Sequence, residues 1–256
     1  MLEWLREDKG DDLDAPETTL RHAEIIARKP FLRALYREWY SAFVAISREL
    51  PRGELVELGS GGGFFRELLP EVTTSDVLPL PNCDLVFSAE QMPFADGSVA
   101  GLCMVDVLHH IPDCERFFSE VQRVLVPGGR LCMTEPANTS FSRLIYQNLH
   151  HEPFRPDADA WTFPSSGPLS SANGALPWII FERDAARFDE LFPGLRVRDI
   201  RPHTPLRYLL SGGVSFRTPF PGWSFDWVSR LERAFDPLLP WTAMFQTVQV
   251  ERKRES

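Results

Sequence analysis

The chain has 256 residues, 43% of them hydrophobic and 25% charged, which fits one α/β domain with insertions better than two full domains. Its 27 basic and 36 acidic residues give a net charge of −9, which argues against nucleic acid as a partner and disfavours contact with a membrane. The four cysteines form no CxxC pair, no apolar run reaches the length of a membrane span, and the acidic N-terminus lacks the pattern of a signal peptide, so we expect a cytoplasmic protein.

Residues 1–50 are expected to form an N-terminal helical cap. Apolar residues recur there at roughly helical spacing from position 25 to position 44, and Pro30 divides the stretch into two helices. Tyr36 and Tyr40 on these helices are candidates for contact with the substrate. An aromatic stripe at helical spacing is more often core than binding site, so we assign Trp39 to packing and keep Tyr36 and Tyr40 as the pocket candidates.

Residues 51–256 are expected to form the main domain, whose first part alternates strands with helices. Strands are predicted at 54–58, 72–77, 84–88, 99–107 and 130–134, with a short helix at 64–69. The segment 99–107 is apolar without alternation, as in a parallel strand buried on both faces. Asp113 is predicted to cap the following helix and Pro127-Gly128-Gly129 to end it. This order is typical of a doubly wound α/β sheet.

The second half of the chain is less regular. Helices are predicted at 139–149 and 183–192, a long loop at 150–177, and strands at 195–201 and 244–251. Two segments, about 138–180 and 203–242, are expected to be lid or substrate insertions. The aromatic residues of this half could pack internally, line an acceptor pocket, or form a dimer interface or membrane patch. Internal packing is favoured, then the pocket, and membrane contact last, for Trp161, Phe163, Trp178, Phe216, Phe220, Trp223, Phe225 and Trp227.

The segment Glu57-x-Gly59-x-Gly61-x-Gly63 follows the first strand and precedes a helix. Glycines in such a place let the backbone turn sharply and approach a ligand closely. The dinucleotide fingerprint GxGxxG does not fit, because its sixth position would be phenylalanine or arginine. Asp76, at the end of the second strand, could accept hydrogen bonds from both ribose hydroxyls, or be only a turn residue. The combination favours a nucleoside ligand over a nicotinamide dinucleotide.

Four further segments follow the glycine loop in the chain: residues 75–77, 89–94, 107–113 and 123–129. Together they resemble class I S-adenosylmethionine (SAM)-dependent methyltransferases, in particular the type 11 group that includes the ubiquinone and menaquinone biosynthesis methyltransferases. The resemblance covers about residues 53–136. It implies a seven-stranded, mostly parallel, Rossmann-like sheet with an antiparallel last strand. It also implies SAM as the cofactor and S-adenosylhomocysteine (SAH) as the product.

The resemblance assigns the cofactor-binding residues by position. The methionyl part of SAM would lie against Glu57, Gly59, Ser60, Gly61 and Gly63, the ribose on Asp76 and the adenine on Val77. The adenine edge would meet Ser88, Ala89 and Glu90, while Asp106, Val107, Leu108 and His109 would border the sulfonium and the acceptor. Ser88 departs from the aspartate that is usual in the group, and a serine loses the charge-assisted part of the adenine contact.

Methyl transfer is an in-line displacement, so a general base is needed only when the acceptor must lose a proton. The candidates are His109, His110 and Glu135, with His109 preferred because His110 is often structural in the resembled group. A purely structural role for both histidines is the alternative. His150 and His151 are further substrate candidates. Together with Glu152 they form a polar cluster, but the sequence shows no further ligands near it, so no metal site is expected.

The predicted function is transfer of a methyl group to O, N or C of a small apolar or aromatic metabolite by a monomer or homodimer. Two alternatives stay open. One is a SAM- or SAH-binding module without transfer activity, and the other is an enzyme that uses SAM for non-methylation chemistry.

Overall fold

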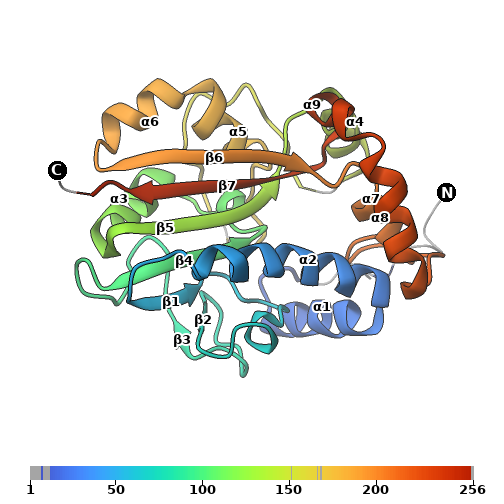
Figure 1. The fold of residues 1–256 in the computed structure, drawn as a ribbon, viewed down its shortest axis with the longest axis horizontal. Coiled ribbons are helices and arrows are strands. Elements are labelled where there is room, and N and C mark those ends of the chain that lie inside the picture. Colours follow the sequence, from blue (N-terminus) through green and yellow to red (C-terminus); the bar gives the residue numbers. More distant parts are fainter. Residues whose placement is uncertain (1–6, 8–11, 151, 166, 168, 255–256) are drawn as a thin grey trace.

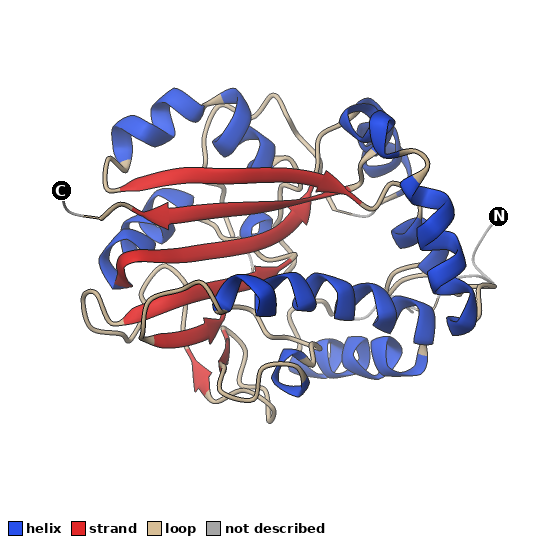
Figure 2. Cartoon of the chain, viewed as in Figure 1, coloured by secondary structure: helices blue, strands red, loops and turns tan. Residues whose placement is uncertain are grey.

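The computed structural model describes residues 7, 12–150, 152–165, 167 and 169–254, and seven strands within them form one sheet in the order β3-β2-β1-β4-β5-β7-β6 (Figures 1 and 2). Pairing is parallel from β3 to β5, and β7 is antiparallel to both of its neighbours. The strands are β1 (Glu54–Glu57), β2 (Thr73–Asp76), β3 (Leu85–Val86), β4 (Val99–Val105), β5 (Leu125–Pro136), β6 (Leu195–His203) and β7 (Phe245–Arg252). The predicted fold class is confirmed. Strand order reverses between β1 and β4, where open α/β sheets place their ligands.

Helices cover both faces of this sheet. The N-terminal pair is α1 (Pro16–Arg28) and α2 (Pro30–Ser47), divided at Pro30 as predicted. The middle helices are η2 (Phe65–Glu67), η3 (Leu108–His110), α3 (Cys114–Val124) and α4 (Ser140–Leu149), of which the last two are capped by Asp113 and Thr139. Then come α5 (Leu176–Trp178), the π-helix η4 (Ile179–Arg183), α6 (Ala185–Leu191), α7 (Arg207–Ser211), η5 (Gly222–Ser224), α8 (Phe225–Arg233), η6 (Asp236–Leu238) and α9 (Leu239–Thr242).

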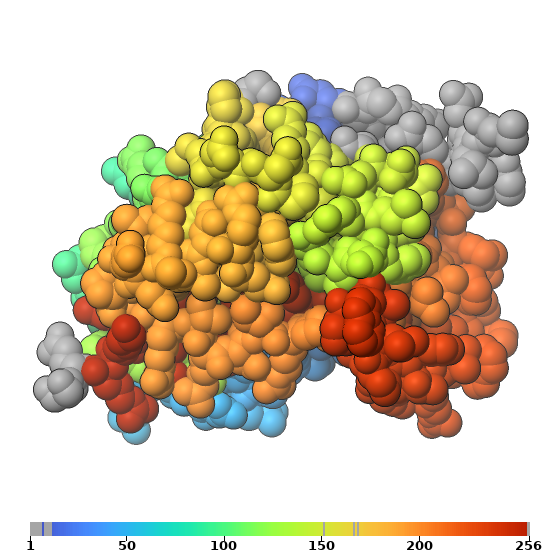
Figure 3. All heavy atoms as spheres, turned by 90° about the horizontal axis from the view of Figure 1, so that it is seen from above, coloured from blue at the N-terminus to red at the C-terminus, as the bar shows by residue number. Residues whose placement is uncertain are grey.

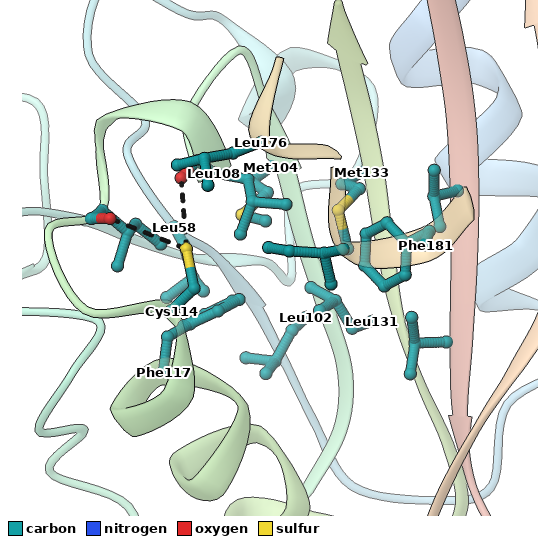
Figure 4. Packing of buried hydrophobic residues seen from close by; sticks show 14 of the residues in the cluster. Leu58, Leu102, Met104, Leu108, Cys114, Phe117, Leu131, Met133, Leu176 and Phe181 are labelled. Atoms are coloured by element: carbon teal, nitrogen blue, oxygen red, sulfur yellow. Dashed lines mark hydrogen bonds between the residues drawn. The ribbon is translucent and has the colours of Figure 1, made fainter. Parts of the chain in front are cut away.

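Alternation along β4 and β5 divides the core into two layers. Leu102, Met104, Leu131 and Met133 point to the side of α3 and η4, where Phe117 and Phe181 pack against them (Figure 4). Cys103 and Cys132, one register position along, point to the opposite side and pack with Tyr40 and Phe43 of α2. The amino-terminal helix α2 therefore replaces a crossover helix on that face, and its inner residues lie close to the end of β1.

The segment Pro127-Gly128-Gly129 does not end the helix. The helix α3 stops at Val124, and β5 already begins at Leu125. Its register against β4 shifts there, from Val99 opposite Leu125 to Gly101 opposite Arg130. The extra residues form an irregular bulge, in which a Cβ on Gly129 would come within 2.9 Å of two backbone carbonyl oxygens. Proline and glycine thus mark a bulge rather than a helix end.

The aromatic residues of the second half divide into two groups, apart from Phe216, which is half-buried. Trp161 and Phe225 are buried, and Phe163, Trp178 and Phe220 pack against the same core. Trp223 and Trp227 are exposed, which contradicts internal packing for these two. Among the described residues, no helix has both the length and the apolar composition needed to cross a bilayer.

Candidate active site

A cavity of about 920 Å³ opens at the carboxyl ends of β1, β2 and β4. The strand side of its wall consists of Glu57, Gly59, Ser60, Gly61, Gly63, Asp76, Val77, Ser88, Ala89, Glu90, Asp106 and Val107. The opposite wall comes from α1, α2 and later loops, and includes Tyr36, Tyr40 and Glu152, while His110 of η3 also lines the cavity. Its size suits a nucleoside-containing ligand together with a small second molecule.

The glycine loop takes a shape that other residues would resist. Gly59 and Gly61 have φ values of 62° and 46°, in the left-handed region. A Cβ on Gly59 would come within 2.6 Å of the Val107 side chain, and a Cβ on Gly63 would overlap the Tyr40 hydroxyl. The loop therefore lies directly against its neighbours and leaves the cavity above it open.

Asp76 connects the loop to the second strand. Its Oδ2 accepts a hydrogen bond of 2.9 Å from the backbone N–H of Gly61, and its Oδ1 accepts one of 2.9 Å from that of Leu78. Burial nevertheless raises the pKa of this carboxyl above its ordinary value. Asp76 thus positions the glycine loop as well as facing the cavity.

Two further carboxyls, Glu57 and Asp106, border the same cavity. Burial raises the pKa of each to about 7, although Ser60 and Tyr40 hydrogen-bond Glu57 and His109 lies near Asp106. Both groups would ionise more readily beside a cation. A ligand with two positive charges, as SAM has, matches this electrostatic environment.

Behind Asp106, His109 is fully buried between two carboxylates. Its Nδ1 lies 2.8 Å from Glu135 Oε2, and its Nε2 lies 3.4 Å from Glu152 Oε2. Burial opposes a charge on this ring, but the two carboxylates hold the pKa of His109 well above its usual value. Glu135 also accepts hydrogen bonds from the backbone N–H groups of Val107 and Leu108. The pair His109–Glu135 therefore fixes the turn after β4.

His110 faces the cavity instead. Its Nδ1 lies 3.2 Å from the carbonyl oxygen of Ser171, which requires an N–H at that nitrogen. Its Nε2 lies 3.6 Å from Glu152 Oε1. Burial and the neighbouring His109 lower the pKa of His110 to about 4, so the ring is neutral near pH 7. A neutral ring with a bare Nε2 can accept a proton.

The adenine end of the predicted site is organised by Ser88 and Glu90. Ser88 Oγ accepts a hydrogen bond of 3.2 Å from the backbone N–H of Glu90, and Glu90 Oε1 accepts one of 2.8 Å from that of Asp113. Val77 lines the cavity with a half-exposed side chain. The serine that replaces the usual aspartate thus already accepts a hydrogen bond from the backbone of its own loop.

Not all predicted site residues reach the cavity. Leu108, His109 and Glu135 are buried behind its wall, so His109 lies in the supporting layer. His150 borders a second, smaller cavity, and His151 lies outside the described residues.

The structure brings together possible metal ligands that are far apart in sequence. Among the described residues, two sets of ligand atoms lie within 4.8 Å of one another: His109, His110 and Glu152, and Asp106, His109 and Glu135. His109 belongs to both sets and lies between the carboxylates of Glu135 and Glu152. A protonated His109 ring compensates the charge of these carboxylates without a metal ion. The absence of a metal site stays a prediction.

Sequence reasoning missed the contribution of α1. Thr18, Thr19, Arg21 and His22 line the cavity opposite the glycine loop. The hydroxyl of Thr19 is buried and has no hydrogen-bond partner among the described residues. The available signal in the sequence was the polar run at the start of α1. A surface helix seldom buries two threonines in its first turns, and here both Thr18 and Thr19 are buried. Glu152 was identified only as part of a loop cluster.

This doubly wound sheet carries a glycine loop and acidic strand ends at its switch point, as the predicted resemblance to class I SAM-dependent methyltransferases implies. Residues 56–133 match the family model described as a methyltransferase domain. The match confirms the predicted resemblance to class I SAM-dependent methyltransferases and SAM as the cofactor. No curated protein matches the sequence.

Solved structures of similar fold are methyltransferases by their descriptions. A SAM-dependent methyltransferase from Thermotoga maritima is 16% identical, with 93% of this chain and 94% of that chain covered and a TM-score of 0.50. A SAM-dependent methyltransferase from Methanosarcina mazei is 15% identical, covers 82% of this chain and 98% of that chain, and has a TM-score of 0.46. Geranyl diphosphate C-methyltransferase from Streptomyces coelicolor is 15% identical, covers 95% and 89%, and also has a TM-score of 0.46.

The residues present fit SAM. At Gly61 a Cβ would meet nothing closer than 3.7 Å, so the loop leaves open space there, and Thr19 borders the same cavity. Two carboxyls with raised pKa values, Glu57 and Asp106, stand where positive charge would favour their ionised forms. The cavity continues past Asp106 to His110 and Glu152, which leaves space for a second molecule.

Proposed function

We propose that the protein transfers the methyl group of SAM to an oxygen or nitrogen of a small aromatic metabolite. The observation that carries this proposal is the continuation of the cofactor cavity from the glycine loop, past Asp106, to a neutral His110. Bound SAM supplies an activated methyl group on a sulfonium. The chain itself must hold the acceptor in line with that group, exclude water and remove a proton.

His110 is proposed to take the proton. The acceptor's O–H or N–H loses it as the bond to the methyl carbon forms, while the electrons of the broken S–C bond stay on sulfur. Ser171 holds Nδ1 of His110 in its N–H form, so Nε2 is the accepting atom, and Glu152 lies beside it to stabilise the imidazolium. His109 and Glu135 are assigned positioning roles, because neither lines the cavity.

The acceptor class follows from the surroundings of His110. An oxygen or nitrogen acceptor carries a proton that Nε2 of His110 can take as the methyl group arrives, so these acceptors are proposed rather than carbon. The smaller cavity beyond Asp106 is lined by the rings of Tyr146, Tyr208 and Phe245, which suit a planar apolar body. The cap at 1–50 and the insertions at 138–180 and 203–242 are proposed to close over this acceptor.

Binding of the cofactor is tested first. SAH should raise the melting temperature by linkage, whereas NAD should not. Asp76→Ala should weaken SAH binding by about tenfold or more without unfolding the chain, because it removes the acceptor for Gly61 and the proposed ribose contact. Stabilisation by NAD alone, or unchanged SAH affinity in the variant, would contradict the proposed site.

Transfer is tested separately. Small phenols and aryl amines are incubated with methyl-labelled SAM, and His110→Gln is compared with the parent protein. The variant should lower kcat about a hundredfold while SAH affinity stays the same, since His110 is proposed to act on the acceptor's proton. Tight SAH binding with no labelled product from any acceptor would favour a binding module instead.

A further inference from the structure

An apolar ridge runs along one end of the molecule. It consists of Trp223, Trp227, Leu231, Phe235, Leu238 and Trp241, carried by η5, α8, η6 and α9. The three tryptophans are 82%, 66% and 59% exposed, the highest values among the large apolar residues here apart from two leucines of α4. In Figure 3 these helices form the red and orange-red end of the molecule, beside the yellow-green spheres of α4.

The outward side of α8 carries large apolar residues beside its charged ones, although its inward side already packs on the core. Phe225, Val228 and Ser229 face inward and are buried. Trp223, Trp227 and Leu231 follow one another at four-residue spacing and therefore share the other side. An ordinary surface helix presents charged and polar residues there. Large rings held in water at such spacing indicate a surface that is covered in use.

The ridge continues onto α4. The helix α9 packs against α4, whose Leu144 and Leu149 are also exposed. The inner side of α4 carries Tyr146, which lines the cavity beyond Asp106 together with Tyr208 of α7. The helix α4 thus carries part of the apolar surface on one side and part of the wall of the proposed acceptor site on the other.

The charges on this surface have the opposite sign to the chain as a whole. Within residues 140–149 and 217–243, the exposed charged residues are four arginines, Arg143, Arg217, Arg230 and Arg233, against two aspartates, Asp226 and Asp236. The local balance is therefore positive, whereas the whole chain carries −9. Two copies brought together through this surface would oppose arginine to arginine. An anionic surface complements it.

We propose that this surface docks the protein onto an anionic lipid bilayer. Tryptophan favours the headgroup region of a membrane, where its ring is buried and its N–H stays hydrated, and arginine pairs there with lipid phosphate. The ridge would lie in the interface plane and the arginines at its rim. Docking in this orientation places α4, and the acceptor cavity beneath it, next to the lipid. Because the chain as a whole is acidic, its composition alone does not reveal this surface.

Sedimentation with vesicles tests the proposal. The full chain should bind vesicles of phosphatidylcholine with phosphatidylglycerol, bind pure phosphatidylcholine more weakly, and be released by salt. The double variant Trp223→Ser/Trp227→Ser should lose about tenfold or more in partitioning. Leu191→Ser is the matched control, because Leu191 is an exposed apolar residue of α6 outside the ridge, and it should bind as the parent does.

A second double variant tests the electrostatic part of docking without removing any apolar residue. Arg230→Gln/Arg233→Gln should weaken binding to the anionic vesicles and leave binding to neutral ones unchanged. The melting shift with SAH should be the same in all variants, so failure of docking and failure of the proposed methyl transfer can be told apart. No binding of the parent protein to vesicles, or equal binding by the tryptophan variant, would overturn the proposal. A dimer in light scattering that Trp227→Ser dissociates would overturn it in favour of a second copy.

Discussion

The two walls of the large cavity are built by different means. On the strand side, the left-handed backbone of Gly59 and Gly61 and the hydrogen bonds of Asp76 determine the shape. On the helical side, the side chains of Thr19 and Tyr36 determine it, on helices that are regular throughout. A wall shaped by the backbone cannot accommodate a new side chain without moving the chain. A wall shaped by side chains can lose a single contact while the backbone stays in place. Substitutions should therefore differ in size between the two walls.

The largest effect is expected where the walls touch. In Gly63→Ala the new methyl group would overlap the Tyr40 hydroxyl and approach the carbonyl oxygen of Ser60 to 2.8 Å. SAH affinity, measured by calorimetry, should fall by about a hundredfold or more as the loop moves. Adding Tyr40→Phe removes one of the two overlaps and should restore part of the affinity. No loss in the single variant would mean that the loop can move without cost.

A smaller effect is expected from pH. Because burial raises the pKa of Glu57 and of Asp106 to about 7, both carboxyls lose protons as pH rises through neutrality. The cationic ligand binds the ionised forms, so the Kd for SAM should fall severalfold between about pH 6 and about pH 7.5. Glu57→Gln should flatten the profile, and SAH, which lacks the sulfonium, should show less of it. A flat profile in the parent protein would contradict the assignment.

The same carboxyls affect the stability of the free protein with the opposite sign. Their folded-state pKa values lie above the unfolded ones, so the folded chain holds more protons in the interval between them. The free energy of unfolding should therefore decrease as pH rises through this interval. Denaturant unfolding without ligand at several pH values measures it.

On the helical wall, Thr19→Val should change two quantities in opposite directions. The hydroxyl of Thr19 is buried without a partner, so its removal should stabilise the free protein by about 1 kcal/mol. If the hydroxyl meets the cofactor, SAH affinity should fall by a few-fold at the same time. Stabilisation with unchanged SAH affinity would place Thr19 away from the ligand.

The smallest change is expected for Tyr36→Phe. This variant keeps the ring that lines the cavity and removes only the hydroxyl, which lies near the carboxyl of Asp106. SAH affinity should change less than about twofold, while KM for an acceptor should rise. A larger effect on SAH than on the acceptor would assign Tyr36 to the cofactor half of the cavity.

The sequence predicted the strand wall well because that wall is local. The glycine loop follows β1 directly, and the acidic residue at the end of β2 stands at a fixed place relative to it. The helical wall depends on contacts between distant parts of the chain. Helical spacing in residues 16–28 predicts a helix but not which side of it meets Gly61.

The histidines show the same limit. His109 and His110 are neighbours in sequence, yet one is enclosed by Glu135 and Glu152 while the other faces the cavity. The difference depends on residues 26 and 43 positions away, which no local pattern relates to them. Proline and glycine at 127–129 likewise indicate a break in regular structure, but only pairing with β4 shows that the break is a bulge.

The backbone conformation of Asp106 also limits which residues related chains can carry at this position. Its φ of 62° lies in the left-handed region, which asparagine, aspartate and glycine enter far more readily than other residues. Asp106→Glu, conservative in charge, should therefore disturb the backbone more than Asp106→Asn, which removes the charge. We expect related chains that keep this turn to vary among those three residues alone. The backbone conformation, rather than the chemistry of methyl transfer, would then determine which residue types can occupy position 106.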